Sequence, residues 1–105
     1  MTTATARVPT THASKYLQQL CKHWQHNLAV EFTPDRGTIT FPRDARGADW
    51  PSDGRATLVA EDDALIVTVD ASNDDHLAAL EETVARHLDR FAFREAPLGF
   101  DWSTA

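Results

Sequence analysis

The chain has 105 residues, a hydrophobic fraction of 42% and a formal net charge of −6 at pH 7. This length corresponds to one domain, since domains commonly span about 100–150 residues, and we expect a single domain over residues 1–105. The acidic balance gives no overall basic field that would attract nucleic acid or anionic lipid. No run approaches the ~20 apolar residues of a membrane span, and the first residues lack the apolar core of a secretory signal. The sequence therefore predicts a cytoplasmic protein with no nucleic-acid or membrane partner.

The first part of the chain contains three strand signals and one helix signal. Apolar and polar residues alternate over 3–8, which predicts a half-buried strand that ends at Pro9. Apolar residues then recur at helical spacing and predict a helix over about 11–26. Alternation returns on both sides of a turn at Pro34–Gly37, which predicts a hairpin over 28–41.

The second part begins with residues 42–54, which are rich in proline, glycine and aspartate and are predicted to form a loop. A weak strand signal over 56–60 and the strongest one, over 64–70, follow it. Ser72 is then expected to cap a second helix, with Asp75 in a capping-box position.

The predicted order is strand, helix, four strands and helix, with a further short strand where apolar residues alternate over 98–102. The economical packing is α+β, with one antiparallel sheet and both helices on its apolar face. The opposite face would then carry a set of threonines: Thr5, Thr33, Thr38, Thr40, Thr57 and Thr68. This topology resembles the TATA-binding-protein-like or helix-grip class, and a ferredoxin-like arrangement is the alternative.

The first predicted helix carries three residues of types that bind metals: Cys21, His23 and His26. At about 100° per residue, Cys21 and His23 point about 200° apart, so one ion cannot take both from a regular helix. His23 and His26 can share a face, but zinc takes three or four protein ligands, and a third would come from elsewhere, such as His87 or a carboxylate. The alternative is that both histidines are solvated near the end of a helix, and we assign no metal.

Cys21 lies within the apolar stripe, which favours a small, inert, buried side chain. The alternative is a thiolate nucleophile paired with His87 from the second helix, although no supporting residue can be identified. Trp50, in the predicted loop, is expected to be exposed and could line a ligand or partner surface.

Arg86, Arg90 and Arg94 recur every four residues along the second helix and its end. Guanidinium groups at this spacing could bind a carboxylate or phosphate through paired hydrogen bonds. A solvated helix face, with pairing to neighbouring carboxylates, is the favoured alternative. Gly-rich phosphate loops and the CxxC, HExxH and GxSxG motifs are absent from the sequence.

Three stretches carry a resemblance to a known family: LCKHWQHN at 20–27, the strand Val30–Phe32, and HLDRFAFRE at 87–95. With them, the chain resembles the bacterial domain of unknown function 2218 family over almost its whole length, from about Ala6 to Trp102. Members of that family usually carry a lysine where Asn27 stands here.

The resemblance implies a setting and no reaction, because the family has no assigned activity. Similar domains are fused to, or encoded near, siderophore-interacting flavin reductases and iron-uptake components, which implies iron or siderophore handling. The positions that match the family pattern are Cys21, Lys22, His23, His26, His87, Arg90, Phe91, Phe93, Arg94 and Glu95.

The leading hypothesis is a non-enzymatic accessory domain that binds a small anionic ligand, a metal complex or a siderophore-interacting protein. Polar contacts would come from the histidines and arginines of the two helices, and the floor from two aromatic rings. These residues are His23, His26, His87, Arg90 and Arg94, with Trp24 and Phe91 as the floor. The alternatives are a small enzyme that uses Cys21 with His87, and a structural or interaction module that docks through the threonine face. No catalytic residue and no cofactor is assigned.

Overall fold

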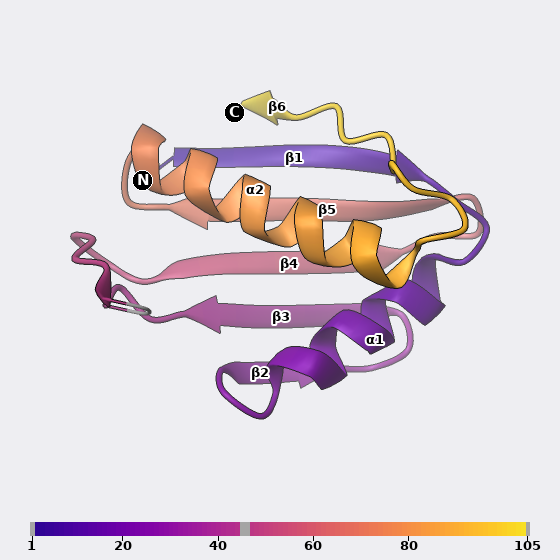
Figure 1. The fold of residues 1–105 in the computed structure, drawn as a ribbon, viewed down its shortest axis with the longest axis horizontal. Helices are drawn as coiled ribbons and strands as arrows, with labels where there is room; N and C mark the ends of the chain where they lie inside the picture. Colours follow the sequence, from indigo (N-terminus) through magenta and orange to yellow (C-terminus); the bar gives the residue numbers. More distant parts are fainter. Residues whose placement is uncertain (1, 45–46, 105) are drawn as a thin grey trace.

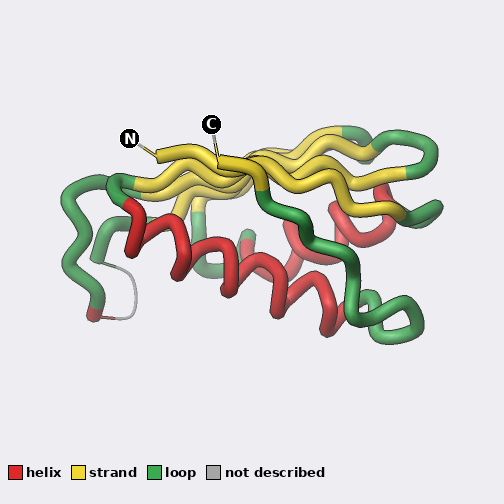
Figure 2. Tube along the Cα trace, turned by 90° about the horizontal axis from the view of Figure 1, so that it is seen from above, coloured by secondary structure: helices red, strands yellow, loops and turns green. Residues whose placement is uncertain are grey.

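The computed structural model describes residues 2–44 and 47–104. They form one six-stranded antiparallel sheet with two helices on one of its faces (Figures 1 and 2). The elements are β1 (Thr2–Pro9), α1 (Ala13–Trp24), β2 (Ala29–Phe32), β3 (Arg36–Phe41), β4 (Gly54–Ala60), β5 (Ala64–Ala71), α2 (Asp74–Phe91) and β6 (Ser103–Thr104). The strand order is β2-β3-β4-β5-β1-β6. The predicted α+β class is confirmed, and four consecutive strands separate the helices, unlike the two of a ferredoxin-like arrangement.

The hydrophobic core fills the space between the sheet and the helices. Alternate residues of β1 and β5, such as Val8 and Val67, are fully buried on the helical side. The stripe of α1 contributes Leu17 and Leu20, and Val84 comes from α2. Burial of one such side chain contributes roughly 1.5–3 kcal/mol, so one continuous cluster holds both helices against the sheet.

A glycine lets α1 lie close to the sheet. The sequence placed Gly37 in the hairpin turn, whereas the structure places it inside β3, where it is buried. A Cβ at this position would lie 2.6 Å from Sγ of Cys21 and 3.3 Å from Cβ of Phe32. The turn itself is closed by Thr33, whose N–H donates to the carbonyl of Arg36 at 2.7 Å.

The start of α2 differs from the prediction by one residue. Asn73, not Ser72, is the N-cap, and its side-chain oxygen accepts the N–H of His76 at 2.8 Å. Such a cap satisfies one of the free amides of the first turn. Ser72 instead hydrogen-bonds the ring of His76. Asp74 and Asp75 occupy the first turn, where negative charge is favourable.

The end of the chain also differs from the prediction. Residues 98–102 are not a strand, because the N–H of Leu98 donates to the carboxylate of Asp89 at 2.8 Å instead of joining the sheet. The final strand is β6, which pairs with β1 through two residue pairs, Ala4 with Thr104 and Thr5 with Ser103. The alternation reflects packing against the core edge, where the rings of Phe100 and Trp102 stack 5.7 Å apart.

The face of the sheet opposite the helices carries a row of threonines, as predicted. In register across four strands, Thr5 faces Thr68, Thr68 faces Thr57, and Thr57 faces Thr38. Thr33 lies in the β2–β3 turn and is outside the row. Within residues 2–44 and 47–104, neither helix is long and apolar enough to cross a membrane.

Candidate functional site

An open cleft of about 520 Å³ lies where the end of α1, the first half of α2 and the loop after β3 meet. The helix α1 supplies His23 and Trp24, the loop supplies Trp50, and α2 supplies His76 and Thr83. Ligand pockets are commonly apolar clefts of about 300–1,000 Å³ with a few polar groups. The size and lining of this cleft correspond to that description.

His76 is the buried polar residue of the cleft, with 1% of its surface exposed. The backbone N–H of Ser72 donates to its Nδ1 at 3.1 Å, and the Ser72 hydroxyl lies 2.8 Å from the same nitrogen. A nitrogen that accepts from an amide carries no hydrogen, so the neutral ring bears its proton on Nε2. Burial lowers the pKa of His76, which also favours the neutral form.

The Nε2–H of His76 has no acceptor in the described part of the chain. His76 as a whole is 1% exposed, so little of this nitrogen is open to solvent. Gly54 makes room for this edge of the ring, because a Cβ there would lie 3.1 Å from Nε2 and 2.3 Å from Cδ1 of Leu80. The His76 ring therefore has one hydrogen-bond donor that no group of the described chain accepts.

Trp50 covers one face of the His76 ring. The two rings are stacked, with centroids 4.6 Å apart and planes inclined by 8°. Hydrogen bonds within the loop position Trp50, because its backbone N–H donates to the carbonyl of Arg43 at 3.0 Å. The N–H of Arg43 in turn donates to the carboxylate of Asp53 at 2.9 Å. Trp50 is therefore half-buried in the cleft wall, and the prediction that it is exposed was wrong.

Another part of the lining is built around Trp24, a residue that is 5% exposed. Its neighbours are Phe41, edge-on at 5.1 Å, and His87, at 4.7 Å between centroids. The ring of His23 lies 5.5 Å from that of His87 and 5.6 Å from that of Phe91. Two of the three stretches that carry the family resemblance, 20–27 and 87–95, therefore meet in space.

The other predicted site residues lie apart from this cleft. His26 is exposed beyond the end of α1, and Arg90 and Arg94 are exposed at the far end of α2. The guanidinium of Arg94 lies 5.7 Å from the ring centroid of Phe93. In the described residues, no group of three or more His, Cys, Asp or Glu side chains could hold a metal ion.

Cys21 is fully buried, and burial raises the pKa of its thiol to about 11. The group is therefore protonated at neutral pH, while reactive cysteines lie in exposed, electropositive surroundings. Its surroundings fit the packing role expected from its place in the apolar stripe.

His76 was missed by the sequence reasoning. It lies just after a helix start, where the pattern indicates capping and gives no sign of burial. The one available signal was Ser72 four residues earlier, a spacing that is too common to identify a site.

Together, the fold and the cleft define a small single-sheet α+β domain with an aromatic-walled cleft beside its helices. A family model described as "Uncharacterized protein conserved in bacteria (DUF2218)" matches residues 5–103, and the chain belongs to this family. It is similar to the NMR structure of PA4090 from Pseudomonas aeruginosa, at 30% identity and a TM-score of 0.70. That match covers 100% of this chain and 96% of the other. No curated protein sequence matches the chain.

Proposed function

We propose that this domain is a non-enzymatic cytoplasmic binding module that holds a planar aromatic small molecule in the cleft. The observation that carries the proposal is the stack of Trp50 on the buried His76 ring. It combines a flat aromatic surface with an Nε2–H donor that lacks an acceptor in the described chain. A planar ligand with a carbonyl oxygen or ring nitrogen at its edge would contact both.

The aromatic walls favour a ring-containing ligand. Aromatic pairs contribute about 0.5–1.5 kcal/mol beyond the burial of their area. Trp24, Phe41 and Trp50 all contribute to the lining of the cleft. A ligand between these walls would bury most of its area, as ligands in clefts of this size do.

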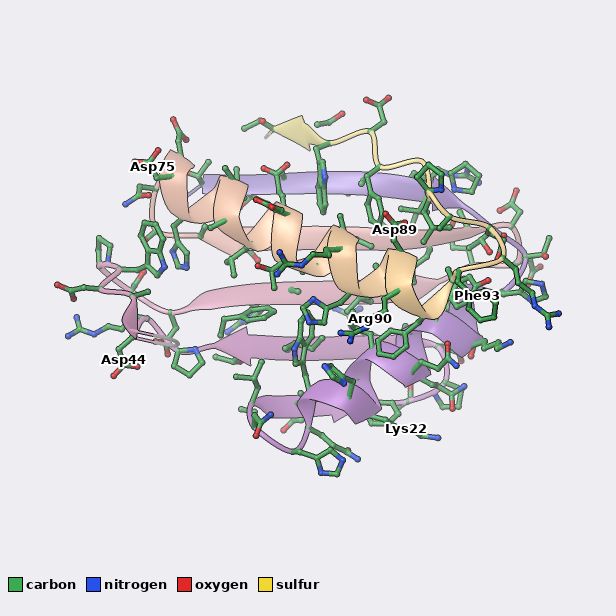
Figure 3. All side chains as sticks on the ribbon, in the orientation of Figure 1. Lys22, Asp44, Asp75, Asp89, Arg90 and Phe93 are labelled. Carbon is green, nitrogen blue, oxygen red and sulfur yellow. The ribbon has the colours of Figure 1, made fainter. Side chains whose placement is uncertain are left out.

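The charges of the cleft favour an uncharged ligand over an anion. Its described lining includes the carboxylate of Asp44 and contains no lysine or arginine. The arginines that the sequence suggested for an anion do not line the cleft. Arg90 lies in the last turn of α2, away from Asp44 (Figure 3). We therefore favour a neutral ligand with hydrogen-bond acceptors.

The proposal extends to a setting in bacterial iron metabolism, with an uncharged aryl-containing siderophore or its neutral ferric chelate as the ligand. What supports this setting is the family resemblance. The non-enzymatic character is supported by the burial and raised pKa of Cys21. If Cys21 reacted with iodoacetamide in the native state as fast as in urea, the enzymatic alternative would regain its nucleophile.

Titration of the intrinsic tryptophan fluorescence tests the ligand proposal. The probes are a salicyl-oxazoline siderophore, its ferric chelate, haem and zinc chloride. We expect saturable quenching by the siderophore or its chelate, with a dissociation constant on the order of micromolar, and weak or no response to zinc. Trp50→Ala should weaken binding about 10-fold, which is the loss of about 1.4 kcal/mol.

Trp102→Phe is the matched control, since Trp102 stacks on Phe100 outside the cleft. It should change the signal amplitude and leave the affinity unaltered. If neither form of the siderophore quenches the fluorescence, the iron setting is wrong. If haem binds tightly in its place, the cleft proposal stands with a different planar ligand.

A further inference from the structure

The turn that follows α2 exposes a large apolar side chain. Phe93 is 72% exposed, and within the described chain it is the one large hydrophobic residue that is fully on the surface. The turn is nevertheless closed by backbone hydrogen bonds. The N–H groups of Glu95 and Ala96 both donate to the carbonyl of Ala92, at 2.8 and 2.9 Å, and the N–H of Ala92 donates to Leu88 at 2.8 Å. Phe93 is thus presented by an ordered turn.

The side chain of Glu95 fastens this turn to the start of α1. The hydroxyl of Tyr16 donates to its carboxylate, and the hydroxyl of Thr10 donates to the same group at 3.0 and 3.2 Å. Tyr16 is buried and Glu95 is exposed, so the contact joins the core to the surface turn. Ordering a contact residue before binding reduces the entropy cost of association. The position of Phe93 is therefore already set before any partner arrives.

In the described chain, the two arginines nearest to Phe93 in sequence form no ion pair with a carboxylate. The ion pair of the described residues is Arg7–Asp63, so Arg90 and Arg94 are unpaired there. The acidic residues next to them in sequence accept hydrogen bonds from other groups. Asp89 accepts the N–H of Leu98 at 2.8 Å, and Glu95 accepts Tyr16 and Thr10. A local basic surface thus remains on a chain whose formal net charge is −6.

We propose that Arg90, Phe93 and Arg94, the Phe93 patch, dock a protein partner whose surface is acidic and contains an apolar pocket for the phenyl ring. Aromatic and arginine side chains are the residues that most often dominate binding energy at interfaces. The guanidinium of Arg94 lies over the Phe93 ring, so a positive charge and an apolar ring are presented together. Acidic charge on the partner would match the unpaired arginines and would speed association.

A membrane surface fits the same patch less well. One phenyl ring supplies little buried area, and anionic lipid would repel the remainder of a chain with a formal net charge of −6. Arg90, Phe93 and Arg94 do not line the cleft, and Phe93 lies on the other side of the view from Asp44 (Figure 3). The patch is therefore independent of the ligand proposal.

Selection from a displayed library of random 12-residue peptides tests the docking proposal on the intact domain. We expect the enriched peptides to be rich in aspartate and glutamate and to share one aromatic or aliphatic residue. Phe93→Ala should weaken their binding about 10-fold, and the Arg90→Gln/Arg94→Gln pair should weaken it similarly while reducing the dependence on salt. Trp50→Ala, in the cleft, should leave their binding unchanged, which separates this proposal from the other.

Three results would overturn the docking proposal. One is enrichment of neutral or basic peptides, or no enrichment at all. Another is binding of the acidic peptides that is insensitive to Phe93→Ala. The third is Phe93-dependent co-sedimentation with phosphatidylglycerol-containing vesicles while no peptide is enriched, which would assign the patch to a membrane surface.

Discussion

Tyr16 in α1 donates its hydroxyl hydrogen bond to Glu95, which lies 79 residues further along the chain. This contact joins the start of one helix to the turn that ends the other. The carboxylate of Glu95 also accepts a hydrogen bond from the hydroxyl of Thr10. The segment before α1 and the turn after α2 are therefore joined through one charged group. The family-matching block at 87–95 is in this way tied to α1 at both of its ends, by Glu95 here and by His87 against Trp24 at the cleft.

We expect a double-mutant cycle on Tyr16 and Glu95 to give a coupling free energy of about 1 kcal/mol. Hydrogen bonds to charged groups contribute about 1.5–3 kcal/mol, and the exposure of Glu95 to solvent reduces that figure. Urea unfolding of Tyr16→Phe, Glu95→Ala and the double variant measures it. Glu82→Ala is the control, because Glu82 is exposed and has no partner in the described chain. Coupling below the error of the cycle would contradict the proposed anchor.

The same pair should make stability depend on pH at both extremes. The Tyr16 hydrogen bond lowers the pKa of Glu95, so the stabilisation is present above the ordinary value of 4.5 and is lost as the pH falls below it. Burial and the contact with Glu95 raise the pKa of Tyr16 to about 12, so stability should fall as the pH rises from 10 towards 12.

In Tyr16→Phe, both of these slopes should become shallower. The urea midpoint, measured at steps of pH for the two proteins, gives the comparison. If the alkaline slope of the variant equalled that of the parent, Tyr16 would not be the group that titrates there.

Local periodicity was sufficient for both helices, for strands β1 to β5 and for their packing. The helical stripe from Leu17 to Trp24 is buried as a stripe, and the alternation in β5 separates its two faces in the way the pattern indicated. These features depend on neighbours within a few positions along the chain. The register of the threonine row from Thr5 to Thr38 followed from the same alternation once the strands were paired.

The features that the sequence did not predict depend on contacts between distant segments. Ser72 and Asn73 are both residues that commonly cap helices. Ser72 hydrogen-bonds the ring of His76 instead, and Asn73 forms the cap. The stack of Trp50 on His76 joins a loop to a helix 26 positions later, and no local pattern encodes it. Arg90 and Arg94 were suggested as ligand contacts from their spacing and from the family resemblance, and Arg90 lies outside the cleft.

Gly54→Ala should disturb the cleft through its buried histidine. The new Cβ would lie 2.3 Å from Cδ1 of Leu80 and 3.1 Å from Nε2 of His76, so both side chains must move. Overpacking of this kind costs about 1–3 kcal/mol. Gly99→Ala is the matched control, since its nearest atom is Cδ of Pro9 at 4.0 Å, and it should change stability by less than about 0.5 kcal/mol. Thermal unfolding measures the loss of stability in each variant. Equal losses would contradict the close approach of Gly54 to Leu80 and His76.

Gly37→Ala should be destabilising, and removal of a sulfur atom should partly rescue it. A Cβ at position 37 would lie 2.6 Å from Sγ of Cys21, a clash that should cost about 1–3 kcal/mol. In the Cys21→Ala background the sulfur is absent, so we expect the cost to fall by at least about 1 kcal/mol. Contacts with Phe32 and Leu17, at 3.3 and 3.4 Å, would keep the rescue incomplete. Strictly additive effects in urea unfolding would show that α1 does not pack on β3 at this point.

His76→Phe should weaken ligand binding about 10-fold, because phenylalanine keeps a ring beneath Trp50 but removes the Nε2–H donor. His26→Phe, at an exposed position outside the cleft, should leave the affinity unchanged. Burial lowers the pKa of His76, so the parent protein should bind equally well from neutral pH down through 6.5, the ordinary value of histidine. Fluorescence titrations at a series of pH values measure both effects. An affinity that fell with a midpoint near 6.5 would mean that the ring becomes protonated there, and a charged ring cannot accept the N–H of Ser72 through Nδ1.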